Sequence, residues 1–73
     1  MRKKIVINQD VGIFLNDLKQ IAMEQGGIAN LSLKTGLSRE TLYKTLSYEG
    51  NPTLKTLNLI VTALGYELII EAI

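Results

Sequence analysis

The sequence predicts a mainly α-helical domain of four helices with a short strand at each end. Three observations support this fold class. Apolar residues recur at helical spacing in segments separated by glycines, a glycine and a serine mark a tight turn near the middle of the chain, and both ends carry short runs of strand-forming residues. With 73 residues, the chain is expected to form a single domain over 1–73.

The composition excludes several classes of function. A hydrophobic content of 47% with 21% charged residues is too apolar for a disordered chain. The sequence contains no cysteine and no histidine, which excludes disulfides, thiolate chemistry and histidine-based metal sites or triads. Because no pair of nucleophile and base or metal cluster stands out, we expect no enzyme, no cofactor and no metal.

The charge and hydropathy patterns favour a cytoplasmic protein. A net charge of +1 is a weak basic balance that neither requires nor forbids a nucleic-acid partner. Behind the basic start at Arg2, the apolar run Ile5–Ile7 is too short for a signal peptide. No apolar run approaches the roughly 20 residues of a membrane span, so no membrane association is expected.

The first part of the chain predicts a strand or extended arm and then a helix. The arm covers Lys3 to Ile7, and Asp10, or alternatively Asn8, is expected to cap the helix. The helix is expected to end near Gly26. Its apolar stripe, interpreted as core rather than as a partner-binding groove, consists of Val11, Phe14, Leu15, Leu18, Ile21 and Ala22.

Residues 27–47 predict a helix-turn-helix. Gly36 stands where a first short helix must stop, because glycine reaches left-handed dihedrals without a Cβ penalty. Leu37 is expected to be buried in the turn, and the Ser38 hydroxyl to cap a second helix beginning at Arg39. Helical spacing places Ile28, Leu31, Ser32, Leu42, Thr45 and Leu46 on the buried sides.

The other side of the second helix is predicted to recognise double-stranded DNA. Its side chains can donate or accept hydrogen bonds at base edges or phosphates. A plain helical hairpin with a solvated face is the alternative, but the short turn, the glycine and the cap match the motif together. The candidate DNA-binding residues here are Ser38, Arg39, Glu40, Tyr43, Lys44 and Ser47.

A fourth helix is predicted from about Thr53 to Leu64. Pro52 lies near its start, where a missing N–H costs little, and Gly65 closes it. Its apolar stripe consists of Leu54, Leu57, Ile60, Val61 and Leu64. The preceding segment can lie along a DNA backbone, which makes Asn51, Thr53 and Lys55 candidate phosphate contacts, although the same residues also suit a turn and cap.

Residues 66–73 predict a C-terminal strand with apolar residues on both faces. A single strand needs a partner. Either it pairs with the N-terminal strand inside the monomer, or strands pair across a twofold axis. Because burial on both sides favours a partner subunit, we expect a homodimer, which would place two recognition helices about 34 Å apart.

Three motifs carry a resemblance to a known family. They are G-L-S-R-E-T-L-Y-K-T-L-S at 36–47, E-G-N-P-T-L at 49–54 and A-L-G-Y-E-L at 63–68. From Phe14 onward the chain resembles the lambda-repressor-like (Cro/C1-type) helix-turn-helix family, and most closely its addiction-module antidote branch. The resemblance implies a four-helix lambda-repressor-like domain that binds operator DNA, represses its own operon and neutralises a cognate toxin, often an endoribonuclease or a gyrase-directed protein.

One difference from the family leaves a second function open. Many relatives have a Thr or Ser followed by Gln, which touches a phosphate, where this chain has Gly27-Ile28-Ala29. Together with the modest charge, this difference favours the alternative of a protein-interaction module on the same fold with weak or no DNA binding.

Overall fold

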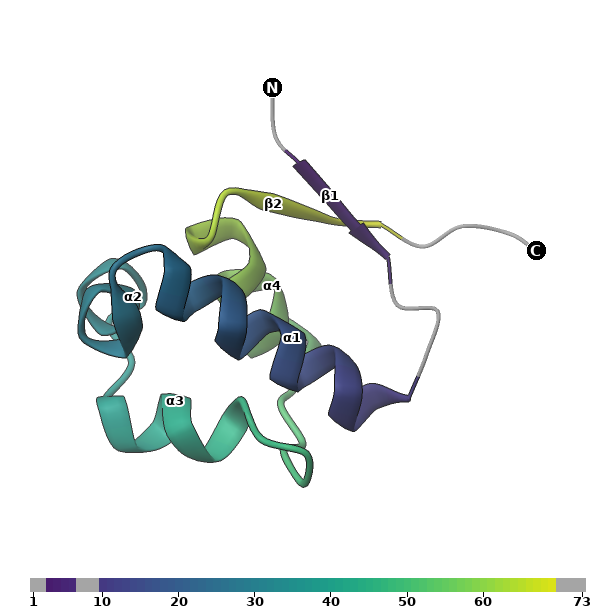
Figure 1. Cartoon of the computed structure of the whole chain (residues 1–73), viewed down its shortest axis with the longest axis horizontal. Helices are drawn as coiled ribbons and strands as arrows, with labels where there is room; N and C mark the ends of the chain where they lie inside the picture. Colours follow the sequence, from purple (N-terminus) through teal and green to yellow (C-terminus); the bar gives the residue numbers. More distant parts are fainter. Residues whose placement is uncertain (1–2, 7–9, 70–73) are drawn as a thin grey trace.

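The computed structural model describes the backbone of residues 3–6 and the whole of residues 10–69. Four helices lie between two short strands in the order β1, α1, α2, α3, α4, β2 (Figure 1). The elements are β1 Lys3–Val6, α1 Val11–Glu24, α2 Gly27–Thr35, α3 Arg39–Thr45, α4 Leu54–Ala63 and β2 Tyr66–Ile69. The prediction of a mainly helical chain with four helices is confirmed.

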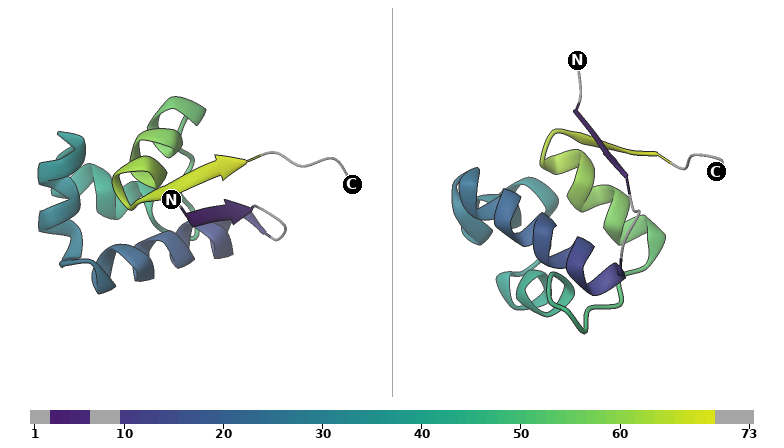
Figure 2. Two further views of the ribbon diagram at one scale, coloured as in Figure 1. Left: turned by 90° about the horizontal axis from the view of Figure 1, so that it is seen from above. Right: turned by 45° about the vertical axis from the view of Figure 1, so that its right-hand side comes forward.

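The strands and α3 occupy opposite sides of the molecule. In Figure 1 and in the right panel of Figure 2, α1 and α4 lie between the strands and α3. Helix α2 packs against both α1 and α4 and also contacts α3. The strands and α3 therefore belong to different faces of the domain.

The core is formed by apolar side chains from all four helices. Each helix contributes the residues that its helical spacing places on one face, and the largest side chain among them is Phe14. Ile21, Leu37, Leu57, Ala63, Tyr66 and Leu68 pack around this core and remain partly exposed. The buried residues are Phe14, Leu15, Leu18, Ala22, Ile28, Leu31, Leu42, Leu46, Ile60, Val61 and Leu64.

The predicted burial was wrong at two positions. Val11 is 55% exposed and Leu54 is 68% exposed, although both belong to the predicted apolar stripes. Each is the first residue of its helix, α1 or α4. Leu37, predicted to be buried, is half-buried, as are Ser32 and Thr45.

The two strands pair with each other inside the monomer. They run parallel, with Lys3 opposite Tyr66 and Val6 opposite Ile69 (Figure 2). This pairing is the first of the two arrangements that the sequence left open. Ile7 and residues 70–73, which were predicted to extend the strands, lie outside the described residues.

Side chains cap the long helices as expected. The Asp10 carboxylate accepts a hydrogen bond from the Gly12 N–H at 2.8 Å, which caps α1. The Thr53 hydroxyl accepts from the Thr56 N–H at 3.1 Å and caps α4, so Pro52 precedes the cap rather than standing in the first turn. The Gln25 amide donates to the Leu64 carbonyl at 2.9 Å and ties the ends of α1 and α4 together.

Truncation of Leu42 is expected to destabilise the whole domain. Leu42 is fully buried, so Leu42→Ala should lower the free energy of unfolding by about 2–5 kcal/mol, measured by urea denaturation. Leu33→Ala is the matched control, because Leu33 is 85% exposed and should change stability by less than about 0.5 kcal/mol. Equal effects of the two substitutions would contradict the packing described.

Candidate nucleic-acid interface

The turn between α2 and α3 is held by two hydroxyl side chains. The Ser32 hydroxyl donates to the Leu37 carbonyl at 2.6 Å. The Thr35 hydroxyl donates to the Leu31 carbonyl at 2.9 Å and accepts from the Leu37 N–H at 3.2 Å. Gly36 has φ of 78°, the left-handed conformation that favours glycine at a helix end. These bonds fix the direction in which α3 leaves α2.

Helix α3 is fixed at both ends. The Ser38 hydroxyl accepts from the Thr41 N–H at 3.1 Å and donates to the Thr41 hydroxyl at 2.8 Å, so Ser38 caps the helix as predicted. Leu42 and Leu46 anchor it in the core. Beyond the helix, only a glycine fits at position 50, because a Cβ there would overlap the Thr45 carbonyl oxygen.

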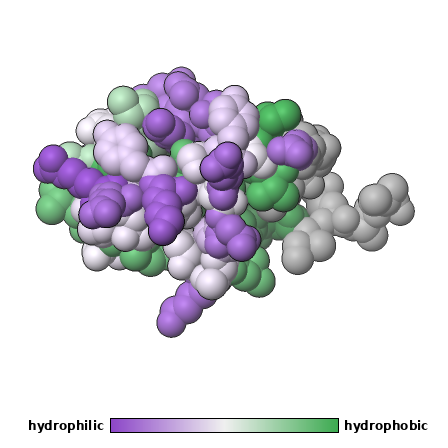
Figure 3. All heavy atoms as spheres, turned by 90° about the horizontal axis from the view of Figure 1, so that it is seen from below, coloured by the Kyte–Doolittle hydropathy of each residue, from purple (hydrophilic) through white to green (hydrophobic). Residues whose placement is uncertain are grey.

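The outward side of α3 carries the predicted recognition residues. Arg39, Glu40 and Lys44 are exposed, and Tyr43 is 50% exposed. Arg39 and Tyr43 are four residues apart, which places them on one face of the helix. Viewed from the side on which α3 lies, much of the surface is hydrophilic, and hydrophobic residues gather toward one edge (Figure 3). The structure therefore presents these four side chains to solvent together.

The other candidate residues differ in whether their side chains already make hydrogen bonds within the protein. Ser47 is half-buried, and its hydroxyl donates to the Lys44 carbonyl at 2.9 Å. The Thr53 hydroxyl donates to Thr56 Oγ1 at 3.1 Å while it caps α4. Asn51 and Lys55 are exposed. Ser38, Ser47 and Thr53 thus have observed structural roles, and any contact they make to DNA is additional.

Sequence reasoning missed one cation beside α3. The Lys19 ammonium, from α1, lies over the Tyr43 ring at 5.6 Å from its centroid. The sequence did not single out Lys19, because no local pattern links residues so distant along the chain. It also missed Ser32 and Thr35 as the hydroxyls that hold the turn, although small polar residues next to a helix-ending glycine are a usable signal.

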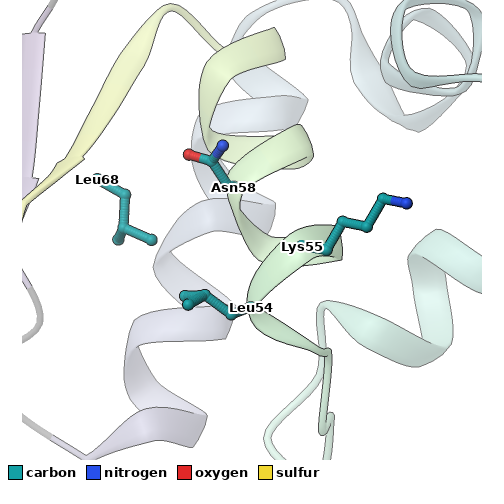
Figure 4. A pocket seen from close by; sticks show the side chains of 4 residues that line it. All are labelled: Leu54, Lys55, Asn58 and Leu68. Atoms are coloured by element: carbon teal, nitrogen blue, oxygen red, sulfur yellow. The ribbon is translucent and has the colours of Figure 1, made fainter.

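An apolar hollow lies away from α3, between α4 and β2. It has a volume of about 460 Å³ and is lined by Leu54, Lys55, Asn58 and Leu68. Leu54 and Leu68 face it from α4 and β2, whereas the Lys55 side chain extends away from it (Figure 4). Among residues 3–6 and 10–69, no cluster of acidic side chains is suited to a metal ion. No helix in this part of the chain has the length and apolarity to cross a membrane.

Comparison with known proteins identifies the family. The model of a family described as probable addiction module antidote protein matches residues 2–72, nearly the whole chain. The chain belongs to this family. No curated protein and no solved structure matched the chain.

Membership of the antidote family confirms the antidote branch of the resemblance noted in the sequence. An antidote implies a cognate toxin as a partner. The family match covers both strands and all four helices, so the elements of both faces lie within the matched region.

Removing the Thr35 hydroxyl is expected to weaken the turn that positions α3. Thr35→Val keeps the side-chain shape but removes both hydrogen bonds and leaves the partly buried Leu37 N–H without its acceptor. We expect a loss of about 1–2 kcal/mol in the free energy of unfolding. Thr62→Val, at an exposed position of α4, is the matched control. Equal unfolding midpoints for the two variants would show that the Thr35 bonds contribute no stability.

Proposed function

We propose that this protein is the antitoxin of a toxin–antitoxin pair and represses its own operon by binding operator DNA as a homodimer. In this proposal, residues 27–47 act as a helix-turn-helix of the lambda-repressor-like (Cro/C1-type) kind within a single DNA-binding domain. The observation that carries the proposal is the exposed face of α3, held rigidly between a capped turn and the core, in a member of an antidote family.

Each side chain has a role suited to its chemistry. Arg39 approaches base edges in the major groove, where a good bidentate contact contributes about 1–3 kcal/mol of discrimination. Glu40, Tyr43 and Lys44 complete the base-reading face. Contacts to phosphates set register and orientation without reading sequence. They are made by five residues that flank α3, the exposed Ser38, Asn51, Thr53 and Lys55 and the half-buried Ser47.

The sheet supports the proposal of a homodimer. Over the described residues it has only two strands, each with one edge that no other strand covers. A two-stranded sheet is marginally stable alone, and uncovered edges invite pairing with another chain. A homodimer with both α3 helices on one side would suit a site whose two half-sites lie about 34 Å apart.

A protein-interaction module is the second candidate function. The apolar hollow beside Leu54 and Leu68 favours it, because the hollow lies away from α3 and can receive a partner. The net charge of +1 also gives a weak general attraction to DNA. In this alternative the fold serves toxin binding, and DNA binding is secondary.

Substitution of Arg39 tests the proposal directly. Arg39 is exposed and outside the core, so Arg39→Ala should remove the preference for DNA from upstream of the protein's own gene over random DNA. A competition gel shift measures this preference, and circular dichroism should stay unchanged. Lys34→Ala removes the same charge from the end of α2 and should retain the preference. An Arg39→Ala variant that keeps the full preference for upstream DNA would refute the assignment of α3 as the helix that reads DNA.

Salt dependence separates the two candidate functions. If the lysine and arginine side chains of a bound dimer together neutralise about six phosphates, affinity for upstream DNA should fall by about 10³-fold between 50 and 200 mM salt. The interaction module predicts weak binding with little difference between upstream and random DNA at any salt concentration. Fluorescence anisotropy across a salt series provides the measurement.

A further inference from the structure

The Lys19 side chain of α1 contacts the ring of Tyr43, a residue of α3 that belongs to the proposed DNA-binding face. Lys19 lies in α1 and is half-buried, whereas Tyr43 lies in the last turn of α3 and is 50% exposed. The Lys19 Nζ atom is 5.6 Å from the centre of the Tyr43 ring. This distance is within the range at which an ammonium is attracted to an aromatic face.

The contact constrains a side chain that would otherwise rotate. An exposed tyrosine near the end of a seven-residue helix has few neighbours to fix its ring. A cation over the ring favours the orientation in which the ring faces α1. Lys19 is half-buried, which is consistent with a stem packed on the protein and an ammonium that reaches the ring.

We propose that Lys19 is a positioning residue for operator recognition, because its ammonium holds the Tyr43 ring in the orientation that reads DNA. The proposal rests on the proposed function and adds a residue of α1 to the recognition surface. Tyr43 is the group that meets DNA, and Lys19 acts through it. Because Arg39 is on the same face as Tyr43, ordering the ring also defines the space beside the Arg39 guanidinium.

A double-mutant cycle tests the proposal, with operator affinity measured on the full chain by fluorescence anisotropy. Lys19→Met removes the ammonium and keeps an unbranched apolar stem. Lys34→Met removes the same charge from α2 and controls for general electrostatic attraction. Lys19→Arg retains a cation that stacks on aromatic rings. Each substitution is repeated in Tyr43→Phe, which keeps the ring, and in Tyr43→Leu, which removes it.

We expect Lys19→Met to weaken binding to upstream DNA by about two- to five-fold more than Lys34→Met does. This excess loss should persist in the Tyr43→Phe background and vanish in the Tyr43→Leu background. Lys19→Arg should instead keep the affinity of the unmodified protein. In the free protein, the NMR chemical shifts of the Tyr43 ring protons should change in the Lys19→Met variant and stay the same in the Lys34→Met variant. Circular dichroism should be the same for all variants.

Equal losses for Lys19→Met and Lys34→Met, or an unchanged excess in the Tyr43→Leu background, would overturn the proposal, because Lys19 would then act through charge alone. Those results leave the proposed function intact if the unmodified protein still prefers upstream DNA. A protein that binds upstream and random DNA equally would instead overturn both the proposed function and this inference.

Discussion

The anchoring of α3 is the constraint on which the account of this protein depends. A helix of seven residues does not persist in water by itself, because its few hydrogen bonds do not offset the entropy lost on ordering it. Here the Ser38 cap and the turn bonds of Thr35 fix its start, while Leu42 and Leu46 bury its inner side. The rest of the core supports this arrangement, and the outer side of α3 is consequently held in place while its side chains stay exposed.

The fold also separates two surfaces. The α3 face and the strands lie on opposite sides of α1 and α4, and the apolar hollow lies between α4 and β2 (Figures 1 and 4). An antidote that also binds DNA benefits from such a separation, because one partner does not displace the other. If a toxin binds at the strand side, its effect on the proposed DNA-binding face has to pass through the packed helices. The ends of α1 and α4 are joined there by the Gln25–Leu64 hydrogen bond.

Much of this fold was predictable from local patterns. The caps at Asp10 and Ser38 and the glycine at 36 each depend on neighbouring residues, and all three predictions are confirmed. The cap at Thr53 is the alternative that the sequence left open beside a phosphate contact. Burial was harder to predict at helix starts, because periodicity places Val11 and Leu54 on the inner face but does not say where the covering elements end. Strand pairing and the Lys19–Tyr43 contact depend on residues far apart along the chain, which no local pattern encodes. The DNA-binding roles of the nine candidate residues stay predictions.

The most direct test of the central claim is NMR chemical-shift mapping of the labelled protein titrated with DNA from upstream of its own gene. The account predicts that amide shifts concentrate in residues 38–47 and 51–55, with a smaller effect at Lys19, and that random DNA moves them less. Two residues that line the hollow, Asn58 of α4 and Leu68 of β2, should stay unchanged. Shifts that gather at Asn58 and Leu68 while α3 is unaffected would contradict the claim that α3 reads DNA.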